Sequence, residues 1–326
     1  MYEEVGKELE EKFVVSDFPL NIAVEVTNQC NLNCIMCGRD TMTRKHGSIK
    51  MSLYKKIVDE IANENPNTRI WLDFYGEPLI AGFKLYYMVD YAKKKGCTNV
   101  FTNSNGQLLT NEYADMLLDS GIDYISLDCD GYSKKVYESI RVGGNRDLFY
   151  SNVEYLLAER DRRHSDTKID IKIIEMDENK NEIDKITEYW KNRGAWTAVR
   201  RKSDWARFRL NPESQNDDRI ACGHAIGTCA ITWDGNMAGC PWDGNCDMNC
   251  GSVVENSVKE LWMERNDTIV KLHVEHRWNE LPQFCQDCNT WKNIGEMRID
   301  EEGNQINRNY GFEDKLFARA AQSGNT

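Results

Sequence analysis

The chain has 326 residues, of which 40% are hydrophobic and 29% charged, and its formal net charge is −12. This length suits one large domain with a smaller one, and the acidic balance argues against a general nucleic-acid binder, whose affinity depends on basic residues that meet phosphates. No apolar run reaches the roughly 18 residues of a membrane helix. The start, MYEEVGKELEEKF, lacks the basic-then-apolar order of a signal peptide, so we expect a cytoplasmic protein with no membrane partner.

After an N-terminal extension (1–20), apolar runs alternate with amphipathic patterns through residues 21–205. The apolar runs predict strands over 22–27, 69–75, 98–102, 123–128, 168–174 and 195–200. The amphipathic patterns predict helices over 52–64, 82–95, 110–120, 147–163 and 180–193, two of them with N-caps at Ser52 and Thr110. Such alternation is typical of an α/β fold with parallel strands. Six units favour a partial (β/α)6 TIM-like barrel, with the functional loops beyond the C-terminal ends of the strands.

The pattern changes near residue 205, and Asn211-Pro212 marks a boundary. The stretch CAITWDGNMAGC (229–240) predicts a hairpin around the two-residue turn Asp234-Gly235. Residues 257–266 predict a helix with Trp262 on its apolar face. We therefore expect a small cysteine-rich domain, a β-hairpin plus helices, over 206–296, followed by a polar C-terminal tail over 297–326.

Twelve cysteines are many for a chain without an export signal, and clustered cytosolic thiols bind metal more often than they form disulfides. One group lies near the start: Cys30, Cys34 and Cys37. The other lies in the last third: Cys222, Cys229, Cys240, Cys246, Cys250, Cys285 and Cys288. Cys97 and Cys129 stand alone. The grouping predicts two metal sites.

The first group, in CNLNCIMC, directly follows the first predicted strand. A structural zinc site needs four ligands, and a disulfide framework needs an even number of cysteines. Three thiolates can hold a four-iron cluster and leave one iron for a non-protein ligand. A partial zinc site completed by a distant residue such as His46 is the alternative.

CNLNCIMC resembles the cluster motif of the radical S-adenosylmethionine (SAM) enzymes. YGEP (75–78) resembles the Gly-Gly-Glu-Pro motif of that family, with Tyr75 in place of the first glycine. TNSNG (102–106) and SLD (126–128) stand where the family contacts ribose and carboxylate. The resemblance implies a [4Fe-4S] cluster on Cys30, Cys34 and Cys37. It also implies that SAM is bound by Met36, Gly76, Glu77, Pro78, Asn103, Ser104, Ser126 and Asp128.

Met36 replaces the aromatic residue that usually precedes the third cysteine, and its thioether can still pack against adenine. The resemblance further implies a 5′-deoxyadenosyl radical that removes hydrogen from an unactivated C–H bond, while the protein positions the substrate and excludes water. The electron donor it implies is reduced flavodoxin or ferredoxin.

The spacing of Cys222, Gly235, Cys240 and the Cys285-x2-Cys288 pair resembles the twitch/SPASM extension of the same family. The resemblance implies an auxiliary [4Fe-4S] cluster on Cys222, Cys240, Cys285 and Cys288, and Gly235 suits a hairpin turn that needs positive φ. No cysteine follows Cys288, which favours a single auxiliary cluster. Cys229 is an alternative ligand, and a zinc ribbon is the alternative for the whole group.

Several reactions remain open. We favour dehydrogenation of a sugar-like or other polar small molecule, with the auxiliary cluster as electron acceptor, because the single-cluster pattern resembles the aminocyclitol dehydrogenases of aminoglycoside pathways. In an epimerase a thiol would return the hydrogen atom; Cys246, Cys250 and Cys129 are the candidate donors, and ordinary packing is their alternative role. A peptide- or protein-modifying SPASM maturase and a non-catalytic iron–sulfur or zinc protein are further alternatives. Arg141 either meets a cofactor or substrate carboxylate or ends a surface helix.

Overall fold

The computed structural model describes residues 15–202, 219–288, 290–291, 297–299 and 305–307. Nine strands form one sheet in the order β6-β5-β4-β3-β2-β1-β7-β8-β9. Its parallel part contains β1 (Asn21–Val24), β2 (Arg69–Trp71), β3 (Asn99–Ser104), β4 (Tyr124–Asp128), β5 (Lys168–Glu175) and β6 (Trp196–Arg201). Within the described ranges β6 and β9 are the two edges of the sheet. The barrel is partial, as the alternation predicts.

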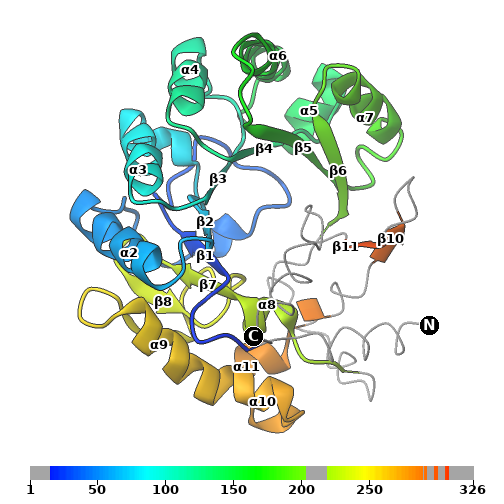
Figure 1. Ribbon diagram of the computed structural model, residues 1–326. Coiled ribbons are helices and arrows are strands. Elements are labelled where there is room, and N and C mark those ends of the chain that lie inside the picture. Colours follow the sequence, from blue (N-terminus) through cyan, green and yellow to red (C-terminus); the bar gives the residue numbers. More distant parts are fainter. Residues whose placement is uncertain (1–14, 203–218, 289, 292–296, 300–304, 308–326) are drawn as a thin grey trace.

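Helices cover the outer face of the curved sheet (Figure 1). They are α2 (Met51–Glu64), α3 (Phe83–Lys94), α4 (Asn111–Asp119), α5 (Lys134–Ile140), α6 (Arg146–Arg162) and α7 (Ile183–Lys191). The predicted N-cap Thr110 is confirmed, because its side chain accepts a hydrogen bond from the Tyr113 backbone N–H. The predicted N-cap Ser52 is wrong. Helix α2 begins at Met51, and Lys50 is its N-cap. The Ile49 N–H is bonded to the Val26 carbonyl, so the chain is still extended at Ile49 and turns into the helix directly after it.

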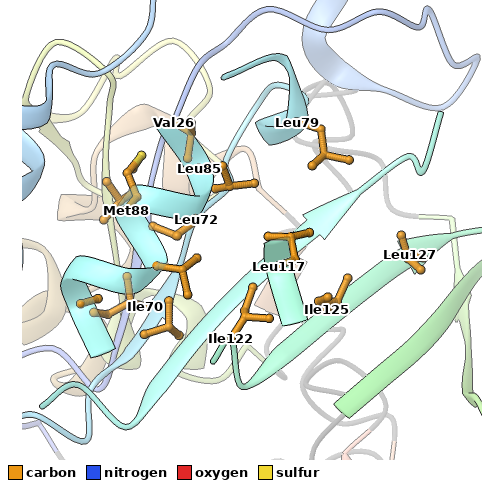
Figure 2. Close-up of a cluster of buried hydrophobic side chains, with 14 of the residues drawn as sticks. Val26, Ile70, Leu72, Leu79, Leu85, Met88, Leu117, Ile122, Ile125 and Leu127 are labelled. Atoms are coloured by element: carbon orange, nitrogen blue, oxygen red, sulfur yellow. The ribbon is translucent and has the colours of Figure 1, made fainter. Parts of the chain in front are cut away.

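The main hydrophobic core lies between the sheet and these helices (Figure 2). Ile70 and Leu72 point outward from the end of β2, and Leu85 and Met88 meet this layer from α3; all four are fully buried. Because successive side chains of a strand alternate between its two faces, Trp71 between them points to the barrel interior. The outer core thus fixes which residues line the inside of the barrel.

The cysteine-rich region continues this sheet. Strands β7 (Thr228–Ile231) and β8 (Asn236–Ala238) form the predicted hairpin, and β9 (Asn249–Ser252) pairs with β8. Thr232 still donates its N–H to the Asn236 carbonyl, so the loop has three residues (233–235) and not two, with Gly235 at φ +96°. Strand β7 pairs in parallel with β1. The hairpin therefore extends the barrel sheet beside the strand that leads to the first cysteine group.

Helical elements of the C-terminal part pack around this hairpin (Figure 1). They are α8 (Gly223–Gly227), α9 (Val258–Arg265), a π-helical turn (Asn266–Val270), α10 (Lys271–Val274), a 3-10 turn (Trp278–Glu280) and α11 (Gln283–Gln286). Two further 3-10 turns, Gly38–Thr41 and Pro78–Ala81, lie in the loops after β1 and β2. Trp262 on α9 is fully buried, as predicted. Strands β10 (Met297–Ile299) and β11 (Gln305–Asn307) pair antiparallel within the predicted tail.

The predicted boundary at Asn211-Pro212 lies outside the described residues, and the division into domains stays a prediction. No helix in the described part of the chain combines the length and apolar character needed to cross a membrane.

Candidate active site

The first cysteine group lies in the loop that follows β1. The backbone of this loop is fixed to the chain after α5, because Asn33 N–H donates to the Val142 carbonyl (2.9 Å) and Ile35 N–H to the Ile140 carbonyl (3.0 Å). Cys30, Cys34 and Cys37 are each half-buried. Burial is the main cause that raises the pKa of each thiol, and charge repulsion from a neighbouring thiolate of the group adds to it. The three thiols therefore lie near enough for their charges to interact.

The donor set of three thiols fits an iron–sulfur cluster with one iron left for another ligand. In the ranges that the structure describes, no three or more His, Cys, Asp or Glu side chains are placed to hold one metal ion. Hydrogen-bond donors lie beside the sulfurs: Asn105 Nδ2 is 3.8 Å from Cys30 Sγ, and Arg141 Nη1 is 3.7 Å from Cys34 Sγ. Such donors stabilise the charge on cluster sulfurs.

The YGEP turn packs directly against this loop. A Cβ on Gly76 would lie 2.0 Å from the Thr27 carbonyl oxygen, so only glycine fits. The carboxylate of Glu77 accepts hydrogen bonds from Ser104 Oγ (2.8 Å) and the Asn105 N–H (2.7 Å), and burial raises its pKa to about 7. Glu77 therefore joins the ends of β2 and β3, and the contacts of Gly76, Glu77 and Pro78 with SAM stay predictions.

Other predicted SAM-binding residues lie at the ends of β3 and β4. Asn103 and Ser126 are paired in register and face the barrel interior, and Asn103 Nδ2 donates to Asp128 Oδ2 (3.1 Å). Ser104 points to the other face, towards Glu77. Met36 is buried and packs against Ile140 and Met176. The contacts of these residues with SAM stay predictions.

Arg141 is a functional candidate that the sequence left undecided. It is buried, so the surface alternative is wrong. Its guanidinium donates to Asp130 Oδ2 (Nε, 2.7 Å), lies 3.5 Å from Asp128 Oδ2, and reaches Cys34. Arg141 therefore connects the first cysteine group to the end of β4.

The second group brings together the four predicted auxiliary ligands. Cys222 precedes α8, Cys240 follows β8, and Cys285 and Cys288 lie on and after α11. Burial raises the pKa of Cys222 to about 11, and the thiolate of Cys288 adds to the increase. The thiolates of Cys222, Cys285 and Cys288 likewise raise the pKa of Cys240 after the larger effect of burial. The donor set fits one cluster.

Cys229 and Cys250 are placed elsewhere. Cys229 is fully buried in the core on the outer face of β7, and Cys250 packs between that core and the second group. The position of Cys229 favours packing over auxiliary ligation. Neither thiol belongs to the cluster of residues that lines the barrel interior.

Cys129 and Cys246, the other candidate hydrogen donors, also differ in position. Cys129 is fully buried behind β4, with its sulfur 3.7 Å from Tyr150 Oη, which favours packing over a place at the barrel mouth. Cys246 packs against the interior cluster of Ala23, Ala230 and Ala238, as Trp71 does. Of the three candidates, Cys246 alone joins this interior cluster.

Tyr75, where this sequence departs from the family motif, lies between the two cysteine groups. Its hydroxyl donates to the Trp242 carbonyl (3.1 Å), and its ring fills the space over Gly244, whose Cβ would lie 2.7 Å from Cζ. Burial raises its pKa most, and the thiolates of Cys37 and Cys240 both add to the increase. Tyr75 is therefore near enough to both groups for their thiolates to act on its hydroxyl.

Comparison with known proteins decides the family. The profile of the Radical SAM superfamily matches residues 24–186, half of the chain, and that of the SPASM iron–sulfur cluster-binding domain matches residues 222–289. The chain belongs to the radical SAM superfamily. It is a radical SAM enzyme with a C-terminal SPASM domain. Its cofactors are those of the family: SAM, a radical SAM [4Fe-4S] cluster and an auxiliary cluster.

Individual relatives are distant. The S-adenosyl-L-methionine-dependent 2-deoxy-scyllo-inosamine dehydrogenase of Niallia circulans is 21% identical over 82% of this chain and 92% of its own length. A probable GTP 3′,8-cyclase of Methanococcus maripaludis is 26% identical over 53% of this chain and 55% of its own length. The chain spans about half the length of several relatives that it matches, this cyclase among them.

Solved structures share the fold at low identity. The complex of BtrN with AdoMet and 2-DOIA superposes with a TM-score of 0.57, at 19% identity, over 83% of this chain and 93% of BtrN. AdoMet-bound anSMEcpe gives 0.59, at 16% identity, over 94% of this chain and 99% of that protein. These likenesses establish the fold alone.

Proposed function

We propose that this radical SAM enzyme dehydrogenates a sugar-like or other polar small molecule and passes one electron to the auxiliary cluster. The observation that carries the proposal is that Tyr75 donates to the Trp242 carbonyl, two residues after Cys240, while the adjoining turn at Gly76 packs against Thr27 and Gln29 before Cys30. An electron acceptor on the second group would therefore lie near the first cluster. The likeness of the chain to the inosamine dehydrogenase over most of both lengths supports the same reaction class.

The chain's residues have separate tasks in this proposal. Cys30, Cys34 and Cys37 hold the radical SAM cluster, and Cys222, Cys240, Cys285 and Cys288 hold the auxiliary cluster. The bound cofactors supply a 5′-deoxyadenosyl radical that removes a hydrogen atom from the substrate. The turn at Gly76 and the polar ends of β3 and β4 orient SAM, and the loop from Cys240 to Cys246 helps to cover the barrel mouth. Reduced flavodoxin or ferredoxin is the proposed electron donor.

The test is an anaerobic reaction of the reconstituted protein with SAM, dithionite and a panel of cyclitols, aminocyclitols and sugars. We expect 5′-deoxyadenosine and one equivalent of a carbonyl product for each equivalent of SAM consumed. A protein that carries iron and sulfide yet never forms 5′-deoxyadenosine would contradict the enzymatic proposal. Formation of 5′-deoxyadenosine with an epimer, and without a carbonyl product, would replace dehydrogenation by the second candidate.

That second candidate is epimerisation, and the position of Cys246 against the interior cluster of Ala23, Ala230 and Ala238 favours it. The reaction in deuterium oxide distinguishes the two. Epimerisation places solvent deuterium at the inverted carbon, and Cys246→Ala abolishes this incorporation while 5′-deoxyadenosine still forms. Dehydrogenation places no solvent deuterium at that carbon, so Cys246→Ala has no incorporation to abolish.

A further inference from the structure

The barrel interior contains charged residues that neither the cysteine motifs nor the SAM motifs include. Asn103, Ser126 and Asp170 are neighbours in register on β3, β4 and β5, and the next interior level holds Asp128 and Lys172. All five side chains therefore point inward. Asn103, Asp128 and Lys172 are half-buried although strands flank them, so their accessible surface faces the interior.

An aromatic layer lies one level closer to the N-terminal ends of the strands. The ring centroid of Trp71 is 5.0 Å from that of Phe101 and 5.9 Å from that of Tyr124, with edge-to-face geometry in both pairs. Lys172 Nζ lies 5.5 Å from the centre of the Trp71 ring. A cation is therefore already accommodated above this aromatic layer.

The interior carries more acids than bases. Lys172 Nζ donates to Asn103 Oδ1 (2.6 Å), and its charge is favoured by the three carboxylates of Asp73, Asp128 and Asp170. Arg200 is the other cation that faces Lys172 and lowers its pKa, after the larger effect of burial. Arg141 and Asp130 add one charge of each sign. Counted together, four carboxylates face three cations.

Asp170 is an interior carboxylate that uses little of its hydrogen-bonding capacity. It is 2% exposed, and neither carboxylate oxygen has a hydrogen-bond partner of ordinary geometry in the described part of the chain, although the nearby hydroxyls of Ser126 and Tyr124 act to lower its pKa. Burial outweighs them and raises the pKa. Buried carboxylates are almost always hydrogen-bonded, so Asp170 has unused capacity for a donor that arrives from the interior.

Asp73 faces the same space from the end of β2. The charges of Lys172 and Asp128 act on its carboxyl group, and it is half-buried. Burial is the main cause that raises its pKa to about 6. Asp73 and Asp170 thus both act on Lys172 and have capacity to accept hydrogen bonds.

We propose that Asp73 and Asp170 bind a protonated amine of the substrate, and that the substrate is an amine-bearing polyhydroxylated small molecule. This inference rests on the proposed function. The ammonium donates hydrogen bonds to the two carboxylates and restores the charge balance of the interior, while hydroxyl groups reach Asn103 and Lys172. The same charge distribution repels a phosphate, which disfavours nucleotides and phosphorylated sugars.

The experiment is calorimetric binding to the reconstituted holoenzyme, with three probes of similar size: 2-deoxy-scyllo-inosamine, scyllo-inositol and myo-inositol 1-phosphate. We expect the amine to bind at least about tenfold tighter than the neutral cyclitol, a factor worth about 1.4 kcal/mol, and the phosphate not to bind. Asp170→Asn and Asp73→Asn should each remove most of the preference for the amine. Asp177→Asn, on a side chain that is 94% exposed, is the matched control and should keep it.

A structural role for Asp170 predicts a different result. Asp170→Asn removes a buried charge whose burial outweighs its nearby hydroxyl donors, so its midpoint of thermal unfolding should be equal to that of wild type or higher, with the iron content retained. A lower midpoint with unchanged amine preference would overturn the inference. Equal affinity for all three probes, tighter binding of the phosphate, or failure of the amine to bind would also overturn it. Absence of 5′-deoxyadenosine from wild type, with amine binding intact, would instead refute the proposed function.

Discussion

The two cysteine groups differ in how the chain builds them. Cys30, Cys34 and Cys37 come from one loop and remain half-buried, as suits a site that must admit a small molecule. Of the second group, Cys222, Cys240 and Cys285 are buried, and they come from segments far apart in the sequence. Folding therefore precedes assembly of the second site, whereas the first needs only a short loop with correct anchors. The first site is therefore accessible to a small molecule, whereas the second is enclosed by the protein.

The largest effect is expected from a variant that removes only the first cluster. Cys34→Ala should abolish formation of 5′-deoxyadenosine, and iron content should fall from about eight to about four per chain, since each four-iron cluster is lost as a unit. Iron and sulfide analysis checks this. About four irons in wild type that fall to none would show that the second group holds no cluster.

A second pair of variants tests the enclosed site. Cys240→Ala should lose about four irons and the carbonyl product while cleavage of SAM persists. Cys229→Ala is the matched control: it should keep all iron and lower the free energy of unfolding by only about 1 kcal/mol, because it leaves a small cavity. Loss of iron from Cys229→Ala would instead make Cys229 a ligand.

Removal of Arg141 should destabilise the fold and alter the first of the two sites alone. Arg141→Gln leaves Asp130 as an uncompensated buried charge and should lower the free energy of unfolding by about 3 kcal/mol. The electron paramagnetic resonance signal of the first cluster should change, and the signal of the auxiliary cluster should not. Arg162→Gln, which breaks an exposed pair with Glu159, is the control and should leave the free energy of unfolding nearly unchanged.

The contact between the two sites can be loosened at Gly244. Gly244→Ala places a methyl group within 2.7 Å of the Tyr75 ring and should cost about 1–3 kcal/mol of stability. Combination with Tyr75→Leu should recover part of this loss, because the ring no longer fills the space. Purely additive effects in denaturant unfolding would show that Tyr75 and Gly244 do not meet.

The smallest effect is expected far from both sites. Thr110→Ala removes the N-cap bond of α4 and should lower the free energy of unfolding by about 1 kcal/mol. Iron content and cleavage of SAM should stay unchanged. Any loss of iron would mean that local stability of the barrel helices limits cluster assembly, contrary to the independence inferred for the first loop.

The local parts of this architecture are predictable from the sequence, and the long-range parts are not. Strands and helices of the barrel follow from periodicity because each depends on near neighbours. The parallel pairing of β7 with β1 joins segments from opposite ends of the chain, and no local pattern signals it. The predicted N-cap at Ser52 is wrong for a similar reason, because the hydrogen bond from the Ile49 N–H to the Val26 carbonyl, distant in sequence, determines where α2 begins.

The same distinction applies to the candidate site. The cysteines are visible because their spacing is unusual. Asp170 and Lys172 are not, since a polar residue at every second position of a strand is ordinary, and the sequence does not show that this face is enclosed. Arg141 was ambiguous because its partners, Asp130 and Cys34, come together only in the folded barrel.

The pairing of β1 with β7 has a consequence for biosynthesis. One edge of the first strand stays open while the whole barrel segment is made, and it is closed only when residues 228–231 leave the ribosome. Contacts between such distant segments form slowly, and an unpaired strand edge invites association with other chains. A nascent or truncated chain that ends before the hairpin therefore exposes the strand that leads to Cys30, and chaperone capture of such intermediates would be governed by this late closure.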